Sequence, residues 1–239
     1  MKNEIEFKKY KTRGAYHWDQ VGLHPTKRNA FVLGRYRNVI FLLRKKLGSL
    51  KDKKILDIGC GDGVLSYMLA KEKAIVSGVD TSDIAIAYAK EKTKKMQIDF
   101  RQASAYELPF DDSEFDAIVS SDVIEHLQDV NQYLKEIKRV TKKDGVIVLS
   151  TPIRFTEEPL DKMHVVEWFE EEYISILAKY FDKTVFYTTH PVFWMEAMQR
   201  SKYSRLLVNV ISYFKNPFEE IKPKFRYMAL QYSVSENNK

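Results

Sequence analysis

The sequence has little of what marks secreted or membrane-spanning proteins. Cys60 is the only cysteine in 239 residues, so no intrachain disulfide can form and a reducing compartment is expected. The longest apolar runs are VIFLL and IAIAYA, far shorter than the roughly 18 residues needed to cross a bilayer. The first residues, MKNEIEFKKYK, contain no apolar segment of a secretion signal. We therefore expect a cytoplasmic protein.

Glycine and proline are also scarce, with nine and seven residues. No internal repeat or linker-like stretch interrupts the chain, and only the final residues, SENNK, have the composition of a frayed end. The length is sufficient for one large domain with a substantial core. We therefore predict a single domain over residues 1–239.

Basic residues are concentrated at the front of the chain. Residues 1–54 hold 15 Lys and Arg against four acids, a net charge of +11, whereas the rest of the chain has 24 basic and 29 acidic residues. Such a front end attracts phosphates on lipid headgroups, nucleic acid or nucleotide-linked sugars. The same charges also fit the solvated face of an amphipathic helix, so both interpretations stay open.

Stretches with strand character alternate with helical stripes along most of the chain. From Thr26 to Leu47, apolar residues recur at helical spacing. Strands are expected at residues 53–59, 74–80, 97–102, 115–121, 145–151, 183–190 and 225–234. Strands that alternate with helices in this way predict an α/β fold with a mostly parallel sheet.

The first expected strand leads into a glycine-rich turn, ILDIGCGDG, from Ile55 to Gly63. Glycines there let the backbone bend sharply and approach a ligand, with the amides of the next helix facing it. Asp80 ends the next strand, 23 residues after Asp57, where a carboxylate can accept both hydroxyls of a ribose. The pattern indicates a nucleotide-type cofactor, although dinucleotide enzymes use a similar turn and the glycines can also serve helix packing alone.

These motifs resemble those of class I S-adenosylmethionine-dependent methyltransferases, of the methyltransferase type 11 and coenzyme-Q O-methyltransferase kind. DIGCGDG is similar to their first motif, VSGVD to the strand ending in the ribose-binding acid, and ASAYELPFDDSEFDAIVSSDVIEHL to the stretch from the adenine loop past strand four. The resemblance covers residues 53–189. It implies a Rossmann-like, doubly wound sheet of seven strands with the last one antiparallel, a helical lid, and S-adenosylmethionine as cofactor, with S-adenosylhomocysteine as product.

The same resemblance implies the cofactor contacts. They are Asp57, Gly59, Cys60, Gly61, Gly63, Asp80, Thr81, Ser104, Ala105 and Ser121. The family often has aspartate where Ser104 stands, so its contact to the adenine amino group lacks charge assistance here. We predict a lid and helix over residues 1–50, a cofactor-binding core over 51–190, a helical insertion over 191–224 and the last strand over 225–234.

A second motif, DVIEHL, lies just past the fourth expected strand. Open α/β sheets bind their ligands at the carboxyl ends of parallel strands. A histidine of near-neutral pKa there can take a proton from an acceptor hydroxyl. We predict His126, Glu125 and His164 as the catalytic residues; alternatively, His126 only caps or orients the next helix.

Four residues around this motif are also similar to a known metal site. Asp122, Glu125, His126 and His164 resemble the E-x-x-E-H plus His ligands of small-RNA 2′-O-methyltransferases, and coenzyme-Q O-methyltransferases share the Glu and His. Two carboxylates and two imidazoles suit Mg²⁺ or Mn²⁺. Aspartate replaces the first glutamate, however, and many relatives without metal share the pattern. The prediction is therefore no metal, with this quartet as the open alternative.

Two further segments bear on the acceptor. YHWDQVGLHPTKRN precedes the first strand, where the resembling family closes its acceptor pocket, which implies substrate contacts from Tyr16, His17, Trp18, His24 and Arg28. Alternatively, its aromatic residues only cover the sheet edge. Residues 191–224 are apolar and aromatic with interspersed basic residues. They form an acceptor cap, a peripheral membrane contact or two ordinary packed helices.

Together these features predict an S-adenosylmethionine-dependent methyltransferase that O-methylates a small or lipid-linked acceptor, such as a sugar or nucleotide sugar of a surface-glycan pathway. The alternatives are an RNA 2′-O-methyltransferase with a divalent metal, a quinone-precursor O-methyltransferase, and a non-catalytic cofactor-binding protein. Nucleic acid is the less favoured partner because no base-stacking platform is evident. The sequence leaves the acceptor and the oligomeric state open.

Overall fold

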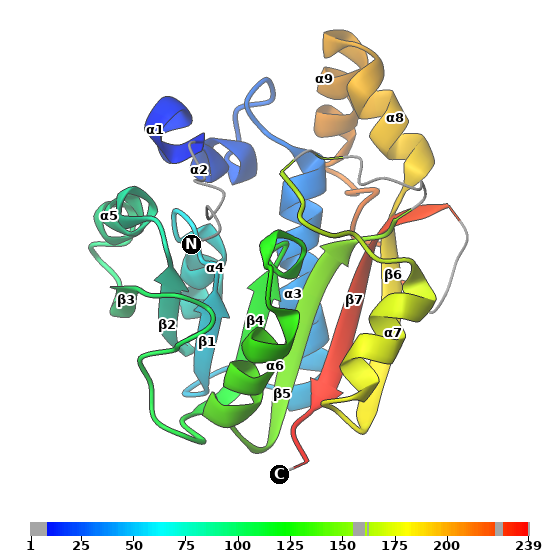
Figure 1. Ribbon diagram of the computed structural model, residues 1–239. Coiled ribbons are helices and arrows are strands. Elements are labelled where there is room, and N and C mark those ends of the chain that lie inside the picture. Colours follow the sequence, from blue (N-terminus) through cyan, green and yellow to red (C-terminus); the bar gives the residue numbers. More distant parts are fainter. Residues whose placement is uncertain (1–8, 155–160, 162, 223–226, 239) are drawn as a thin grey trace.

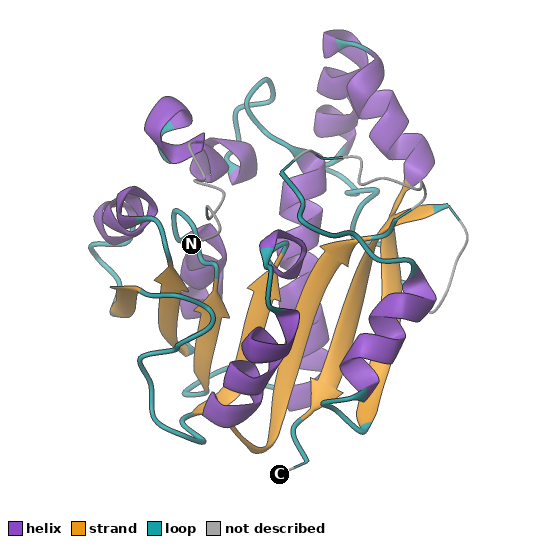
Figure 2. Ribbon diagram, in the orientation of Figure 1, coloured by secondary structure: helices purple, strands orange, loops and turns teal. Residues whose placement is uncertain are grey.

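The computed structural model describes residues 9–154, 161, 163–222 and 227–238. This part of the chain forms a seven-stranded sheet covered by helices (Figures 1 and 2). The helices are α1 (Lys9–Arg13), α2 (Tyr16–Val21), α3 (Ala30–Leu47), α4 (Val64–Lys71), α5 (Asp83–Lys92), α6 (Val130–Val140), α7 (Glu170–Ala178), α8 (Val192–Arg200) and α9 (Lys202–Ile211), with a 3-10 turn, η1 (Ile124–His126). The strands are β1 (Lys54–Ile58), β2 (Ile75–Asp80), β3 (Ile98–Gln102), β4 (Phe115–Ser121), β5 (Thr141–Pro152), β6 (Lys183–Pro191) and β7 (Met228–Glu236).

The strands follow the order β3-β2-β1-β4-β5-β7-β6. Strands β1 to β5 pair in parallel, whereas β7 is antiparallel to both of its neighbours, β5 and β6. Parallel neighbours need crossover connections, which α4, α5 and α6 supply. The predicted α/β fold, a doubly wound sheet with an antiparallel last strand, is confirmed. That strand was expected from residue 225, and residues 225 and 226 lie outside the described part.

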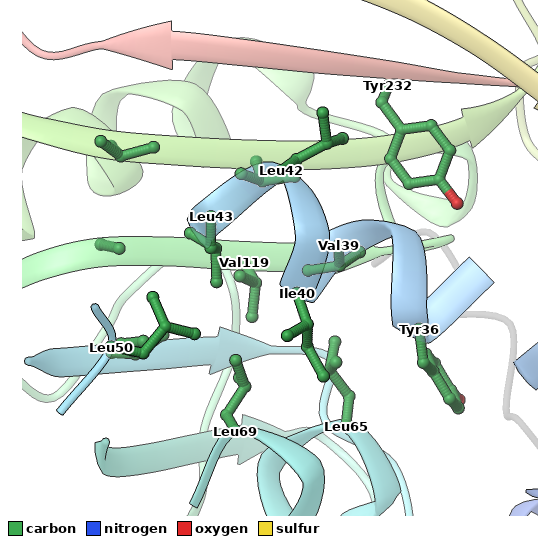
Figure 3. Close-up of a cluster of buried hydrophobic side chains, with 14 of the residues drawn as sticks. Tyr36, Val39, Ile40, Leu42, Leu43, Leu50, Leu65, Leu69, Val119 and Tyr232 are labelled. Atoms are coloured by element: carbon green, nitrogen blue, oxygen red, sulfur yellow. The ribbon is translucent and has the colours of Figure 1, made fainter. Parts of the chain in front are cut away.

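Apolar side chains fill both faces of the central strands. Ile55 and Val119 pack towards α3 and α4, whereas Leu56 and Ile118 pack towards α6 and α7. Figure 3 shows the first layer, in which Val39, Leu43 and other side chains of α3 meet Val119 of β4 and Leu65 of α4. Strands buried on both faces have no alternation of apolar and polar residues, which is why their sequences are continuously apolar.

Helix α3 begins later than its apolar stripe suggests. The side chain of Asn29 accepts hydrogen bonds from the amides of Phe31 (3.1 Å) and Val32 (3.4 Å), as an N-cap residue does. The helix therefore starts at Ala30 rather than Thr26, and the residues before it are free to form a separate connection. That connection carries α1 and α2, two short helices that no periodicity in the sequence indicates.

Four helices lie beyond the carboxyl ends of the parallel strands. Helices α1 and α2 stand above β1 and β2, and the α8–α9 hairpin stands above β6 and β7 (Figure 1). The predicted lid and insertion thus occupy the edge of the sheet where ligands bind in open α/β folds. None of the described helices is both long enough and apolar enough to cross a membrane.

Candidate functional site

The carboxyl end of β1 opens into a tight glycine loop. Gly59 and Gly61 have φ angles of +71° and +54°, which residues with side chains rarely adopt. A Cβ atom at Gly59 would clash with Val123, and one at Gly61 would clash with the hydroxyl of Tyr10. Both glycines are therefore required by the backbone and by the close approach of the neighbouring segments.

Asp80, the last residue of β2, lies beside this loop. Its carboxylate accepts hydrogen bonds from the amides of Gly61 and Ser82, each at 2.9 Å. Burial raises the pKa of Asp80 above its ordinary value, while the two amide bonds favour the charged form. The carboxylate also lines the adjoining cavity, where it can accept the hydroxyls of a ribose.

A cavity of about 1610 Å³ runs from the glycine loop to helix α8. The predicted cofactor residues that line it are Gly59, Cys60, Gly61, Asp80, Thr81, Ser104, Ala105 and Ser121. Asp57 and Gly63 lie behind the loop instead. Asp57 is buried and accepts a 2.6 Å hydrogen bond from Ser66 Oγ. Gly63 directly precedes α4 and packs against Ala89 of α5. This placement suits a role in shaping the loop rather than in touching a ligand.

Helix α2 is fastened to the glycine loop through Asp62. The carboxylate accepts from the amide of His17 at 3.0 Å and lies 3.1 Å from His17 Nδ1. Trp18 Nε1 donates to the Asp62 carbonyl at 2.7 Å. These bonds hold Tyr16 and His17 in the cavity wall, as expected for a lid.

The other three predicted substrate residues do not line the cavity. Trp18 packs against Tyr67 of α4 with ring centroids 5.0 Å apart. His24 lies exposed in the loop after α2, and Arg28 is buried with its Nε donating to Ser212 Oγ at 2.9 Å. Trp18 thus anchors α2 to α4, and Arg28 anchors the α2–α3 connection to Ser212, which directly follows α9. A substrate contact from these three stays a prediction.

At the other end of the cavity, Glu125, His126 and His164 meet. Each offers one ligand atom, and these atoms lie within 4.8 Å of one another. The two imidazole rings are 5.0 Å apart. The amides of Val165 and Val166 donate to the Glu125 carbonyl at 2.8 and 3.2 Å, so the distant segment that carries His164 is held beside η1.

The two imidazoles have different partners. His126 Nδ1 lies 2.9 Å from the carbonyl of Met163, which only a protonated Nδ1 can satisfy, so the neutral ring has its lone pair on Nε2. His164 Nδ1 contacts the carboxylate of Glu167, a buried residue. Burial lowers the pKa of His126 below its ordinary value, so this imidazole is a neutral base at pH 7.

Glu125 is fully buried between these groups. Its Oε2 accepts a hydrogen bond from Thr151 Oγ1 at 3.1 Å, and its Oε1 has no hydrogen-bond partner among the described residues. Burial and then the nearby Asp122 raise the pKa of this carboxyl well above its ordinary value. A buried oxygen without a partner, beside two imidazoles, is a position that a cation or a ligand hydroxyl would satisfy.

Asp122 turns away from this cluster. Its φ angle is +55°, and its carboxylate pairs with Arg35 and accepts from Ser150 Oγ at 3.1 Å. The quartet suggested by the sequence is thus a trio in the described structure, Glu125, His126 and His164. The aspartate that departs from the E-x-x-E-H pattern is the one that has another partner.

Arg35 lines the cavity and Asp62 holds α2 to the glycine loop, yet neither was predicted from the sequence as a site residue. Arg35 lies on the apolar stripe of α3, four residues after Phe31 and four before Val39. A charged residue at a position that this spacing places on the buried face is the signal by which Arg35 could have been predicted. Asp62 stands inside the glycine motif itself. Only the structure pairs it with His17, because that contact joins residues 45 positions apart.

Residues 56–149 match the family model described as a methyltransferase domain. Among curated proteins, the chain is 33% identical over 156 residues to a ubiquinone biosynthesis O-methyltransferase of Pelagibacter ubique, covering 62% of this chain and 65% of that protein. It is 34% identical over 158 residues to the ubiquinone biosynthesis O-methyltransferase of Azorhizobium caulinodans, covering 61% of each. The chain thus spans less than two thirds of the length of these relatives.

Solved structures share the fold at low sequence identity. Phosphoethanolamine N-methyltransferase 2 of Haemonchus contortus, solved with S-adenosylmethionine, superposes with a TM-score of 0.68 at 19% identity, covering 97% of this chain and 59% of that one. A 4+2 cyclase superposes with a TM-score of 0.60 at 18% identity, covering 84% and 80%. Neighbours as different as these show the fold alone.

The sheet order, the glycine loop with Asp80 and the match over residues 56–149 together make this chain similar to the class I S-adenosylmethionine-dependent methyltransferases. Within that class, the chain is similar in sequence to the O-methyltransferases of ubiquinone biosynthesis.

Proposed function

We propose that this protein transfers the methyl group of S-adenosylmethionine to a hydroxyl oxygen of an apolar, hydroxylated acceptor, of which a quinone precursor is the best example. One observation carries the proposal. A single cavity joins the glycine loop and Asp80 at one end to His126 and His164 at the other. A methyl donor at the first end and a hydroxyl at the second would be aligned for direct transfer.

His126 is the proposed general base. The sulfonium already activates the methyl group, so the protein has to orient the acceptor and remove one proton from its hydroxyl. The bond from His126 Nδ1 to the Met163 carbonyl leaves the lone pair on Nε2, and burial keeps the ring neutral. This oxygen-directed chemistry is supported by the sequence relatives, which are named O-methyltransferases.

The walls at this end favour an apolar acceptor. Six apolar residues line the cavity, Phe31, Pro152, Ile153, Val192, Met195 and Leu230, together with polar residues that include Arg35, Glu196 and Gln199. A sugar or nucleotide sugar presents many hydroxyls, each of which needs a polar partner when it is buried. A lipid-linked aromatic ring with a few hydroxyls needs fewer such partners and can place its tail against the apolar residues of the lining.

The test is a methyl-transfer assay with labelled S-adenosylmethionine and three acceptor classes: catechols with prenyl tails of increasing length, nucleotide sugars, and single-stranded RNA. We expect transfer to the prenylated catechols, with kcat/KM rising as the tail lengthens. Transfer to the nucleotide sugar or RNA alone would refute the proposal. Cofactor binding without transfer to any class would favour the non-catalytic alternative.

A second mechanism rests on the same three side chains. The unpartnered Oε1 of Glu125, together with Nε2 of His126 and a nitrogen of His164, fits the ligands of a divalent cation. Such a cation would lower the pKa of an acceptor hydroxyl. Dialysis against EDTA separates the mechanisms: activity that survives favours His126 as base, and activity that is lost and restored by Mg²⁺, Mn²⁺ or Zn²⁺ favours the cation.

The remaining parts of the proposal concern the whole chain. We infer one domain over residues 1–239, with the α8–α9 hairpin as part of the acceptor cap, supported by Val192 and Met195 in the cavity wall. A cytoplasmic location is supported by the single cysteine, Cys60, which is buried and free. The test of domain organisation is limited proteolysis, in which one domain resists cleavage between residues 190 and 225 until it unfolds globally.

A further inference from the structure

Helix α9 presents a continuous apolar stripe to solvent. Tyr203, Leu207 and Val210 follow one another at spacings of four and three residues, and Phe214 continues the line in the turn after the helix. All four are exposed, Leu207 by 61% and Phe214 by 91%. Figure 1 places α9 at the far edge of the molecule, beyond the ends of the strands. Single exposed apolar residues are ordinary, but a stripe along one helix face marks a surface that is covered by something.

The stripe is not needed to hold α9 in place. The opposite face of the helix is anchored by Asn209, whose amide nitrogen donates to the carbonyls of Arg28 (2.5 Å) and Pro25 (3.2 Å) and whose Oδ1 accepts from the Ala30 amide (3.1 Å). Val208 is buried beside it. Polar ties and an apolar contact therefore fix the inner face, and the outer residues are available for another purpose.

A neighbouring loop extends the same surface. Leu23, which is 81% exposed, lies next to the hairpin because the hydroxyl of Tyr213 donates to its carbonyl. Two segments distant in sequence, joined by this hydrogen bond, thus each expose large apolar side chains. We call Leu23, Tyr203, Leu207, Val210 and Phe214 the outer stripe.

The charges around the outer stripe indicate what covers it. Between residues 192 and 215 the chain has four basic residues and one acid, and the basic ones are Arg200, Lys202, Arg205 and Lys215. An apolar helix face flanked by basic residues is the pattern of helices that lie in the interface of an anionic bilayer. A two-fold pair of this chain would instead bring the same basic residues face to face, which repulsion opposes.

We propose that the outer stripe docks this protein on the surface of an anionic bilayer, with α9 lying in the headgroup region. The hairpin also connects this surface to the site. Helix α8 packs against α9, and its Val192, Met195 and Gln199 line the cavity. Docking would bring the α8 wall of the cavity close to the lipid, which suits an acceptor with an isoprenoid tail. Only this last step rests on the proposed function.

Binding is measured by co-sedimentation with sucrose-loaded vesicles of phosphatidylglycerol and phosphatidylcholine, without S-adenosylmethionine or acceptor. The variant is Leu207→Ser together with Phe214→Ser. The matched control is Phe41→Ser, which changes an exposed aromatic residue (52% exposed) on α3, away from the stripe. We expect the double variant to bind at least about tenfold more weakly, because two large apolar side chains no longer leave water. The control should bind like the unmodified protein.

The unmodified protein should also bind less as salt rises or as phosphatidylglycerol is withdrawn. Unchanged binding of the double variant, or no binding of the unmodified protein, would overturn the proposal. A dimer in analytical ultracentrifugation that the double variant abolishes would overturn it too, in favour of a second copy as the occupant. S-adenosylhomocysteine affinity, unchanged in the variant, verifies the fold. Since the vesicles contain no acceptor, vesicle binding and methyl transfer can fail independently.

Discussion

Asp62 holds the lid helix α2 to the glycine loop, and replacing it by alanine tests whether that contact controls cofactor exchange. The side chain is nearly completely buried and accepts from the His17 amide at 3.0 Å, with His17 Nδ1 at 3.1 Å. Asp62→Ala removes both contacts and leaves only the bond from Trp18 Nε1 to the backbone carbonyl. The lid then closes over the cofactor with two fewer attachments.

The magnitude follows from the number of bonds. A hydrogen bond contributes about 1 kcal/mol net, and somewhat more when one partner is charged, so two bonds to a buried carboxylate contribute about 2 kcal/mol. That is roughly a 30-fold change in the ratio of open to closed lid, because 1.4 kcal/mol corresponds to a factor of ten. If the lid must open for exchange, S-adenosylhomocysteine should dissociate about 30-fold faster from Asp62→Ala.

The measurement is stopped-flow displacement of bound S-adenosylhomocysteine, followed by tryptophan fluorescence, to which Trp18 contributes from its contact with Tyr67. Asp19→Ala is the control, because it removes an exposed ion pair with Lys27 from the same helix and should change the rate less than twofold. Equal dissociation rates for Asp62→Ala and the unmodified protein would refute the role of Asp62 in holding the lid closed.

Three further outcomes are expected at the other end of the cavity. His126→Gln should lower kcat by roughly 10²- to 10⁴-fold in the methyl-transfer assay, with S-adenosylmethionine affinity unchanged by calorimetry; a loss below tenfold would exclude His126 as the base. Since burial lowers the pKa of His126, its neutral form persists at pH 7, and kcat/KM should fall only as pH drops below about 6.5; an acid limb centred above pH 7 would contradict this. Because the pKa of Glu125 is raised, its contribution to stability is present at low pH and is lost as pH rises through the folded-state pKa, so Glu125→Gln should be at least as stable as the unmodified protein at pH 8 in thermal unfolding; marked destabilisation would show that the charged form is bound to a partner such as a cation.

The cofactor half of the molecule was predictable because its signals are local. The strand into Gly59 and Gly61, and the acid at the end of the next strand, lie in short stretches whose backbone requirements are visible as residue types. The strands themselves were found because burial on both faces leaves continuously apolar sequences. A cofactor contact of Asp57, implied by the resemblance, stays a prediction; the hydrogen bond that its buried carboxylate accepts from Ser66 depends on how α4 lies against the loop, which the sequence does not reveal.

The acceptor half was less predictable because its contacts join distant segments. Arg28 and Trp18 are predicted to contact the substrate, and the sequence does not reveal their packing partners, since a cation and an indole in an irregular segment serve recognition as readily as packing. The hydrogen-bond partner of Arg28, Ser212, lies 184 residues away. His164 was found only through resemblance, and its place beside Glu125 depends on two backbone hydrogen bonds from Val165 and Val166. No periodicity encodes such contacts.

A 4+2 cyclase shares this fold with a TM-score of 0.60, so the fold does not determine which reaction occurs. What differs between such proteins must lie in the parts that meet the acceptor. Under the proposed function those parts are α3, the segment carrying His164, and α8, three elements that line the cavity and come from separate regions of the sequence. Because α8 is attached to α9 and α9 carries the outer stripe, a change in how the hairpin docks would also move one wall of the acceptor pocket. Acceptor choice and membrane contact are therefore expected to be coupled, and a substitution on the stripe should change KM for long-tailed acceptors while leaving KM for S-adenosylmethionine unchanged.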